Sequence, residues 1–431
     1  MAKQILIKNT NILAMTENSG SEAIIGDILI EGQYIKKVGQ INDYEQDIEI
    51  INGNNCAALP GLVNCHTHGA MTLLRGYADD MELMPWLEQK IWPREAKLDA
   101  EHIYWGSMLA ILEMLKTGTT TFADMYFFMN KVAEAVEESG IRAVLARGMI
   151  GFNDKANTTL KEAKEFIPAW QGAGKGRITC MLGPHAPYTC PPEYLTKVLE
   201  LAYELKVGIH IHLAETKKEF TDIRKQYGKT PIKHVYDLGL FNVPVLAAHC
   251  VHLTEEDIDI LQEVKAGIAH NPTSNMKLAS GMAPIPQLLE AGVKVGLGTD
   301  GTASNNNLNM MEEMHIASLL HKVSWGDPTV MPAYQVLQMG TVFGAGAVNL
   351  IDEIGTIEEG KKADVILVDL DKPHLYPCHD IVANLIYSAQ GSDVKTSIID
   401  GQIVMKDREV LTIDEEKVKF EAKRYAQMML L

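Results

Sequence analysis

Cysteine and positive charge are both scarce in this chain of 431 residues. Its six cysteines stand at positions 56, 65, 180, 190, 250 and 378, and no two of them form a Cys-x-x-Cys pair. So few thiols argue against a disulfide-rich secreted scaffold and favour a reducing, cytoplasmic location. Lys and Arg number 39 against 56 Asp and Glu, a formal net charge of −17. Because nucleic acid and anionic membrane surfaces are bound through a basic face, neither is expected as a partner.

Long hydrophobic runs are also lacking. No segment approaches the roughly 18 apolar residues of a membrane-spanning helix, and polar residues interrupt the stretch 1–20 before a signal-peptide core forms. Hydrophobic residues make up 46% and charged residues 22%, which is ordinary for a folded globular protein. The composition predicts a soluble folded protein but does not name its ligand.

Strand-like runs occupy both ends of the chain. These runs are β-branched and are separated by Gly, Asn or Gln: residues 5–7, 22–32, 34–39, 363–370 and 397–410. Neither end alone has enough strands to be stable, so the two ends are expected to meet in one sheet domain. The prediction is a small composite β-sandwich domain made of residues 1–58 and 353–431.

The middle of the chain alternates short apolar runs with helix-like segments such as 129–140 and 192–206, which is typical of parallel α/β proteins. The strand candidates are residues 62–68, 119–125, 142–148, 177–183, 206–215, 243–250, 265–271 and 293–300. Eight units in roughly 290 residues predict a (β/α)₈ TIM-like barrel, here over residues 59–352. An open doubly wound sheet could also hold eight strands, but no Gly-x-Gly-x-x-Gly follows the first of them.

Polar side chains end most of these apolar runs: His66, His68, His185, His212, Glu215, His249, His270 and Asp300. In a barrel, all of them project from the C-terminal rim, where barrel enzymes have their active sites. The His-x-His pair places two rings on one side of its strand, because side chains alternate with a period of two. Together with the His and Asp that end the fifth and eighth strands, this pair offers three nitrogens and one carboxylate, which suit Zn²⁺ and also Fe²⁺.

Periodicity alone does not choose between His210 and His212, which share one face of the fifth strand. We expect His212 to be the ligand because it is nearer the rim and Glu215 follows it, and we expect His210 to pack beneath. His270 is predicted to be structural, and Cys65 points to the opposite face of its strand from its two histidine neighbours.

Four motifs closely resemble the amidohydrolase superfamily: PGLVNCHTHG (60–69), HIHLAET (210–216), AAHCVHL (247–253) and GLGTDG (296–301). The resemblance covers nearly the whole chain. Within the superfamily, the chain looks most like the 5-methylthioadenosine/S-adenosylhomocysteine deaminases. Two longer stretches favour that group, residues 75–98 after the first strand and GPHAPYTC (183–190) after the fourth.

The resemblance implies a ligand set of His66, His68, His212 and Asp300 for one divalent metal ion, Zn²⁺ in the first instance, with Fe²⁺ as the alternative. A second metal in related barrels often uses a carbamylated lysine near strand four, and residues 178–186 contain no lysine. A single metal ion per subunit is therefore expected.

The resemblance also implies the remaining roles. Glu215 would move a proton to the purine ring, and His249 would hydrogen-bond the metal-activated water, which makes both of them catalytic together with Asp300. The expected substrate-binding residues are Glu95 on the ribose hydroxyls, Arg147, His185 and Trp86, with Glu215 and Asp300. Trp86 and Trp92 could line an apolar slot for a thioether.

The expected activity is hydrolytic deamination of 5'-substituted adenosines by a metal-activated water. Substrates would be S-adenosylhomocysteine and 5'-methylthioadenosine, giving S-inosylhomocysteine and 5'-methylthioinosine, with 5'-deoxyadenosine and adenosine as further candidates. Metal binding lowers the pKa of water to about 7, and a buried Glu with a raised pKa could protonate ring nitrogen N1.

Two alternatives stay open. One is an amidohydrolase that acts on another heterocycle, as a guanine-type deaminase or a triazine hydrolase does. The other is a non-catalytic barrel relative that serves in binding or assembly. The sequence does not determine the oligomeric state, although barrel enzymes of this kind often associate and a homo-oligomer is possible.

Overall fold

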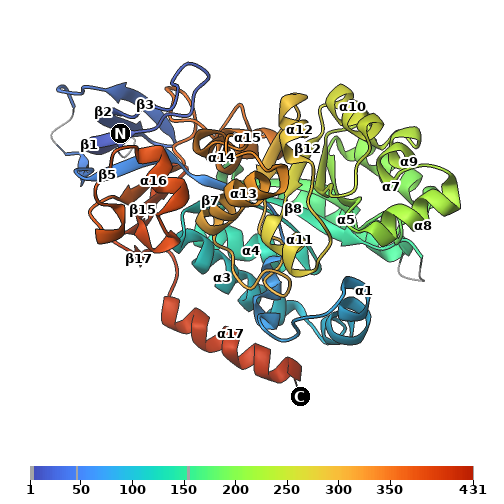
Figure 1. The fold of residues 1–431 in the computed structure, drawn as a ribbon. Helices are drawn as coiled ribbons and strands as arrows, with labels where there is room; N and C mark the ends of the chain where they lie inside the picture. Colours follow the sequence, from blue (N-terminus) through green and yellow to red (C-terminus); the bar gives the residue numbers. More distant parts are fainter. Residues whose placement is uncertain (1–3, 45–46, 153–155, 431) are drawn as a thin grey trace.

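The computed structural model describes residues 4–44, 47–152 and 156–430, which build a parallel barrel beside a second sheet (Figure 1). The barrel sheet has eight strands that pair in chain order. They are β6 (Leu62–Thr67), β7 (Thr119–Tyr126), β8 (Arg142–Met149), β9 (Ile178–Pro184), β10 (Gly208–Leu213), β11 (Val245–His249), β12 (Gly267–His270) and β13 (Lys294–Leu297). The predicted TIM-like barrel is confirmed, and each strand lies within a few residues of its predicted range.

Helices separate the barrel strands along the chain. The longer ones are α3 (Ala100–Lys116), α4 (Met129–Ser139), α5 (Ala156–Trp170), α7 (Pro192–Leu205), α8 (Lys217–Tyr227), α10 (Glu255–Val264) and α13 (Met310–Trp325). Shorter ones are α6 (Ala173–Gly176), α9 (Pro231–Asp237), α11 (Pro272–Lys277), α12 (Ile285–Glu290), α14 (Ala333–Gly340) and α15 (Val342–Ala347). None of the helices in the described ranges combines the length and the apolar character needed to cross a membrane.

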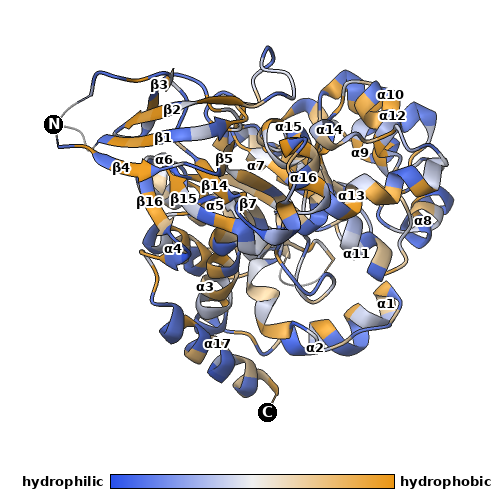
Figure 2. Cartoon of the chain, turned by 60° about the vertical axis from the view of Figure 1, so that its left-hand side comes forward, coloured by the Kyte–Doolittle hydropathy of each residue, from blue (hydrophilic) through white to orange (hydrophobic). Residues whose placement is uncertain are grey.

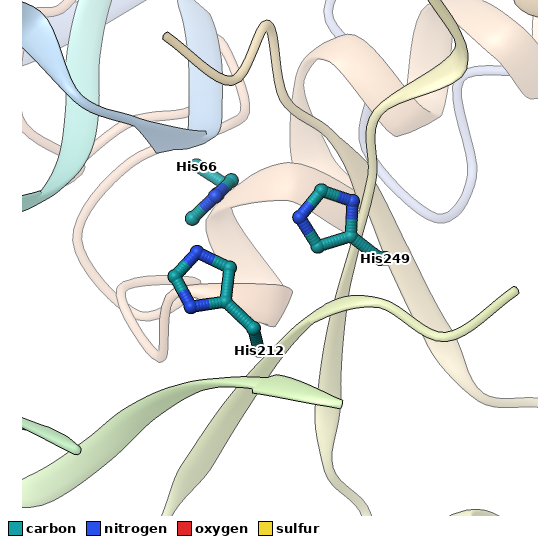
Figure 3. A group of neighbouring side chains, drawn as sticks. All are labelled: His66, His212 and His249. Carbon is teal, nitrogen blue, oxygen red and sulfur yellow. The ribbon is translucent and has the colours of Figure 1, made fainter. Parts of the chain in front are cut away.

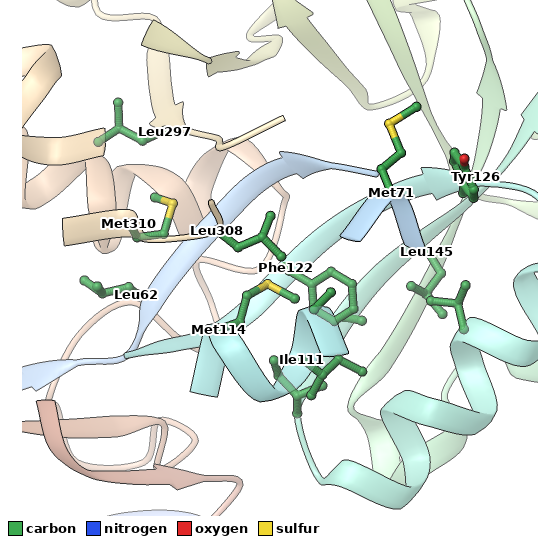
Figure 4. Packing of buried hydrophobic residues seen from close by; sticks show 14 of the residues in the cluster. Leu62, Met71, Ile111, Met114, Phe122, Tyr126, Leu145, Leu297, Leu308 and Met310 are labelled. Carbon is green, nitrogen blue, oxygen red and sulfur yellow. The ribbon is translucent and has the colours of Figure 1, made fainter. Parts of the chain in front are cut away.

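The barrel core is built from strands that are buried on both faces. Strand β7 is buried along its whole length, as expected for a parallel strand that is covered on both sides. On its outer side, Ile111 and Met114 of helix α3 pack near Phe122 (Figure 4). Asp99 is the N-cap residue of helix α3, and its carboxylate accepts hydrogen bonds from the backbone N–H groups of Glu101 and His102. Hydrophobic residues colour the strands orange in Figure 2, whereas outer helices such as α8 carry blue polar faces.

Side chains and loop atoms close the barrel between its last and first strands. The Asn64 amide donates a hydrogen bond to Oγ1 of Thr299 at 2.7 Å and accepts one from the Thr299 backbone at 3.1 Å. One residue further along, the backbone N–H of Asp300 donates to the carbonyl of His66 at 2.9 Å. These bonds place two predicted metal ligands from opposite ends of the barrel sequence next to each other.

The second sheet combines both ends of the chain, as predicted. Its strands are β1 (Gln4–Ile12), β2 (Ile24–Glu31), β3 (Tyr34–Gly39), β4 (Glu49–Asn52), β5 (Cys56–Pro60), β14 (Val365–Asp369), β15 (Val394–Ile399), β16 (Gln402–Lys406) and β17 (Glu409–Val410). The antiparallel pairing of β5 with β14 joins the N-terminal strands to the C-terminal ones in one nine-stranded sheet. The exact domain limits stay a prediction.

Two further features connect this sheet to the barrel. The guanidinium of Arg142, at the start of β8, is buried and forms bonds of 2.7 and 3.1 Å to the carboxylate of Asp364 and of 3.4 Å to that of Asp400. Helix α16 (Ile381–Tyr387) packs on α14, and helix α17 (Glu415–Leu430) extends along α3 (Figure 1).

Candidate active site

Three histidines at the barrel rim, His66, His68 and His212, each use Nδ1 in a contact with the protein and leave Nε2 available to a ligand. Nδ1 of His68 lies 2.6 Å from the carbonyl of Met125, and Nδ1 of His212 lies 2.7 Å from the carbonyl of His185. A carbonyl only accepts, so each Nδ1 carries the hydrogen and each Nε2 keeps its lone pair. Nδ1 of His66 contacts Nε2 of His210 at 2.8 Å, beneath the rim. In metal-binding histidines, the ring nitrogen that does not bind the metal usually forms such a hydrogen bond, which orients the ring.

The free nitrogens and one carboxylate oxygen point at a common space. Nε2 of His68 and of His212 face each other at 3.4 Å, and two lone pairs cannot form a hydrogen bond. Nε2 of His66 is buried and has no hydrogen-bond partner among the described residues. Oδ1 of Asp300 lies 3.4 Å from Nε2 of both His66 and His68. Three imidazoles and a carboxylate in this relation fit a divalent metal ion.

His249 also belongs to this cluster. The rings of His66, His212 and His249 surround one space in Figure 3, and their nitrogens lie within 4.8 Å of one another. Nδ1 of His249 lies 2.9 Å from Oδ1 of Asn275 and 3.2 Å from Nδ2 of Asn271. Its Nε2 lies 3.9 Å from the carboxylate of Glu215.

Burial and neighbouring charges set the ionisation of these groups. Burial lowers the pKa of His66 to about 4 and that of His212 well below its usual value, which keeps both rings neutral as metal ligands must be. Burial raises the pKa of Asp300, but contact with His66 and the other imidazoles outweighs it and holds that pKa well below its ordinary range. For His249, burial lowers the pKa, and the carboxylates Glu215 and Asp300 outweigh it and raise it.

Asp300 is oriented by hydroxyl groups. Ser274 of helix α11 and Ser304 donate hydrogen bonds to its Oδ2 at 2.6 and 2.9 Å, and the backbone N–H of Gly301 donates to Oδ1 at 2.8 Å. Its own backbone has a φ of +61°, a left-handed conformation that non-glycine residues adopt rarely. The carboxylate is therefore held in one position at the end of β13.

One pocket brings together three of the four predicted metal ligands and most of the other predicted site residues. It is lined by His68, His212, His249 and Asp300, by Glu95, His185 and Glu215, and by an apolar wall that includes Leu83, Trp86, Leu87, Trp92, Phe127 and Met149. The segment from α1 (Leu83–Trp86) to α2 (Trp92–Glu95) forms much of that wall. Burial raises the pKa of Glu215, so this carboxyl holds its proton to a higher pH than an exposed glutamate does.

Glu95 reaches the pocket from α2 and is fixed there by Tyr126. The phenol donates a hydrogen bond to Oε1 of Glu95 at 2.6 Å. Burial raises the pKa of Glu95, and the bond from Tyr126 opposes that effect.

Arg147 is placed differently from the other predicted residues. It lies in β8, but its side chain is not among those that line the described pocket. Nε of Arg147 instead donates to Glu162 of helix α5 at 3.0 Å, and its guanidinium lies over the ring of Phe127. A contact of Arg147 with a substrate carboxylate stays a prediction. His185 and Trp86 do line the pocket, and His270 is buried against His321 at 3.1 Å, away from it.

Several residues of the site were missed in the sequence. Tyr126 stands one residue beyond the predicted strand 119–125, and Ser274 and Asn275 follow His270 in a short helix that had no clear signal. Asn271 precedes that helix and could have indicated a turn that returns to the rim. Nothing in the sequence marked Tyr126 as a partner of Glu95.

Comparison with known proteins agrees with this geometry. A model of the amidohydrolase family matches residues 57–404. The chain is 56% identical over 429 residues to a 5-methylthioadenosine/S-adenosylhomocysteine deaminase of Desulforamulus reducens, covering 98% of each chain. It is 55% identical over 431 residues to a protein of the same name from Syntrophomonas wolfei, covering 99% of each.

Solved structures show the same fold. An adenosine deaminase from Xanthomonas campestris with bound zinc superimposes with a TM-score of 0.95 at 34% identity, covering 99% of both chains. A zinc-bound atrazine chlorohydrolase from Arthrobacter aurescens has a TM-score of 0.91 at 25% identity, covering 98% of this chain and 100% of that one. The chain therefore belongs to the amidohydrolase family and, within it, groups with the 5-methylthioadenosine/S-adenosylhomocysteine deaminases.

Proposed function

We propose that this protein hydrolytically deaminates 5'-substituted adenosines, S-adenosylhomocysteine and 5'-methylthioadenosine first among them. One observation carries the proposal. The cluster of candidate metal ligands, the buried carboxyl of Glu215 and the Tyr126-bound carboxylate of Glu95 line the same pocket. The names of the relatives at 55 and 56% identity support the same substrates.

His66, His68, His212 and Asp300 would hold one divalent ion, and zinc in two structural neighbours supports Zn²⁺ over Fe²⁺. The ion would supply a nucleophile at neutral pH by lowering the pKa of water to about 7. The protein's task is then to orient the purine, accept one proton and donate another.

The two proton transfers fall to two neighbouring groups of the pocket, His249 and Glu215, which lie 3.9 Å apart. His249 lines the pocket with its Nε2 close to Glu215, and its ring would accept the proton that the attacking water releases. Glu215 keeps a proton because burial raises its pKa, and it donates that proton to N1 of the purine as the water adds to C6. The proton that the water released then passes from His249 to the exocyclic nitrogen, and the C6–N bond breaks with loss of ammonia. As C6=O forms, the remaining hydroxyl proton passes to Glu215, which restores its protonated form.

Glu95 gives the pocket its preference for nucleosides. Its carboxylate would accept hydrogen bonds from the two ribose hydroxyls, with Tyr126 holding it in place. Beyond it, Trp86, Leu87 and Trp92 form an apolar wall that suits a thioether substituent. The cytoplasmic location and the possible homo-oligomer stay predictions.

The loss of adenine ultraviolet absorbance tests the proposal. The metal-loaded protein is incubated with S-adenosylhomocysteine, 5'-methylthioadenosine, 5'-deoxyadenosine and adenosine, and kcat/KM is compared among them. Conversion of the first two to their inosine forms with release of ammonia supports the proposal. No change in any of the four, with a metal ion bound, would refute it.

A further inference from the structure

Glu219 is a fully enclosed acidic residue with no place in the chemistry described above. It lies in the first turn of helix α8, is 4% exposed and does not line the pocket. Both oxygens of its carboxylate are used, since Oε1 accepts from the backbone N–H of Ala214 at 3.0 Å and Oε2 from that of Glu215 at 2.8 Å. The side chain therefore binds the backbone of the residue that we propose as the proton donor.

This pattern differs from an ordinary helix cap. Thr216 is the N-cap residue of α8, and its Oγ1 accepts from the backbone N–H of Glu219 at 3.1 Å. In a capping box, the acidic residue at this position returns the bond to the N–H of the N-cap residue itself. The carboxylate of Glu219 does not bond to the N–H of Thr216 in this way, and it accepts hydrogen bonds from the N–H groups of the two preceding residues instead. The acid thus stabilises the loop after β10 rather than the helix end.

The same loop is held from its other side by the chain after β11. The carbonyl of Ala214 accepts hydrogen bonds from the backbone N–H groups of Val251 and His252 at 3.0 and 2.9 Å. Ala214 itself has a φ of +52°, a conformation that needs support from its surroundings when the residue is not glycine. Glu219 supplies the support on the N–H side.

We propose that Glu219 is a positioning residue of the deaminase, which acts through Glu215 by fixing where the proton-donating carboxyl meets the purine ring. The inference rests on the proposed function of Glu215. A carboxylate suits the task because it has only acceptors for two converging N–H groups, whereas an amide would turn an N–H₂ group toward one of them. Burial raises the pKa of Glu219 to about 7, although the two backbone N–H groups oppose this.

The test is a double-mutant cycle between Glu219→Gln and Glu215→Gln, measured as kcat and KM on 5'-methylthioadenosine together with bound metal per chain. A misplacement of about 1 Å at a catalytic group can cost on the order of 100-fold in rate. We expect Glu219→Gln to lower kcat by about 10- to 100-fold with KM changed less than about 3-fold and metal content unchanged. In the Glu215→Gln protein, adding Glu219→Gln should lower kcat almost no further, because Glu219 acts on kcat only through the carboxyl of Glu215.

Asp257→Asn provides a matched control. Asp257 is a buried acid at the same position of helix α10. It forms a true capping box with Thr254 and does not line the pocket. This variant should keep the wild-type kcat. If Glu219→Gln does not fold, Glu219→Asp carries the same cycle, since it keeps the charge and shortens the reach. Equal losses in both backgrounds, or an unchanged kcat, would overturn the proposal.

The wild-type rate and the variants answer separate questions. An inactive, metal-loaded wild-type protein refutes the proposed function, whereas the cycle compares variants of an active one. Crystal structures add a readout that needs no activity. A shift of the Glu215 carboxyl in Glu219→Gln but not in Asp257→Asn supports the positioning role, and an unmoved Glu215 contradicts it.

Discussion

The hydroxyl of Tyr126 donates a hydrogen bond of 2.6 Å to Oε1 of Glu95. Tyr126 ends strand β7 of the barrel, and Glu95 ends helix α2 in the segment that walls the pocket. The bond therefore fastens a segment outside the barrel to the barrel rim and fixes the carboxylate that we assign to the ribose.

Removing this carboxylate should affect nucleosides selectively. Hydrogen bonds to a charged group contribute about 1.5–3 kcal/mol, so Glu95→Ala should lower kcat/KM for 5'-methylthioadenosine by about 10- to 100-fold or more. Any slow turnover of free adenine should stay unchanged, because a bare base has no ribose hydroxyls. Equal losses for both compounds would show that Glu95 supports the fold of the pocket instead.

Removing only the hydroxyl of Tyr126 should have a smaller effect on activity than Glu95→Ala, and the effect should be mainly on KM. Tyr126→Phe keeps the ring but leaves Glu95 free to turn, and we expect KM to rise by about 3- to 10-fold. Tyr104→Phe is the control, because Tyr104 donates a bond of the same length to Glu138 and neither residue lines the pocket. Steady-state kinetics of both variants tests this. A rise of KM in Tyr126→Phe alone supports the role of the bond to Glu95, and an equal rise in both variants contradicts it.

The metal site predicts a loss of both metal and activity when a ligand is removed. His68→Ala takes one nitrogen from the cluster, and it should lower the affinity for Zn²⁺ by at least 10- to 100-fold, the range seen for weaker disturbances of such sites. His252→Ala is the control, since its ring binds the carbonyl of Ser280. Elemental analysis after dialysis measures the metal, and parallel addition of Zn²⁺ and Fe²⁺ to chelator-treated protein shows which ion restores deamination.

The metal cluster was accessible from the sequence because its chemistry restricts residue types. Only a few side chains bind zinc, and the barrel places strand ends on one rim, so His66, His68, His212 and Asp300 could be brought together without a structure. The choice of His212 over His210 is consistent with the structure, in which Nε2 of His210 contacts Nδ1 of His66 beneath the cluster.

The supporting contacts could not be derived in the same way. Tyr126 meets Glu95, and Ser274 meets Asp300, only because helices and loops fold back onto the rim. Arg147 shows the same limit, since its strand was placed correctly while its side chain pairs with Glu162 of a following helix. Such contacts depend on where a helix packs, and apolar periodicity reports the buried face of a helix but not its neighbours.

Glu313 makes stability depend on pH. This carboxyl of helix α13 is fully buried and accepts hydrogen bonds from Asn305 and from the backbone of Thr273, and burial raises its pKa from 4.5 to about 7. Between these values the folded protein holds a proton that the unfolded chain has released. Its contribution therefore makes the free energy of unfolding fall as the pH rises through that window, by on the order of 3 kcal/mol in all.

Glu313→Gln removes the titrating carboxyl, so the free energy of unfolding should fall less as the pH rises. Urea unfolding at pH 5 and at pH 8 measures this free energy, and its fall between the two should be about 1–3 kcal/mol smaller for the variant than for the wild type. Glu312→Gln, on the same turn but only partly buried, should follow the wild-type curve. Parallel curves for wild type and Glu313→Gln would contradict the assignment.

Arg142 should contribute strongly to stability and little to catalysis. Its guanidinium neutralises Asp364 and Asp400 between the barrel and the composite sheet. Arg142→Met removes the cation that binds the buried Asp364, whereas Asp400 keeps the ammonium of Lys362 at 3.5 Å. Breaking a buried ion pair in this way costs about 3–5 kcal/mol of the free energy of unfolding.

Lys218→Met is the control. It breaks an exposed pair with Asp222 and should cost about 0–1 kcal/mol. Chemical unfolding measures both, and Arg142→Met should keep near-normal KM while folded, because Arg142 starts β8 at the end away from the rim. A loss below about 1 kcal/mol would show that water or a rearranged lysine replaces the guanidinium.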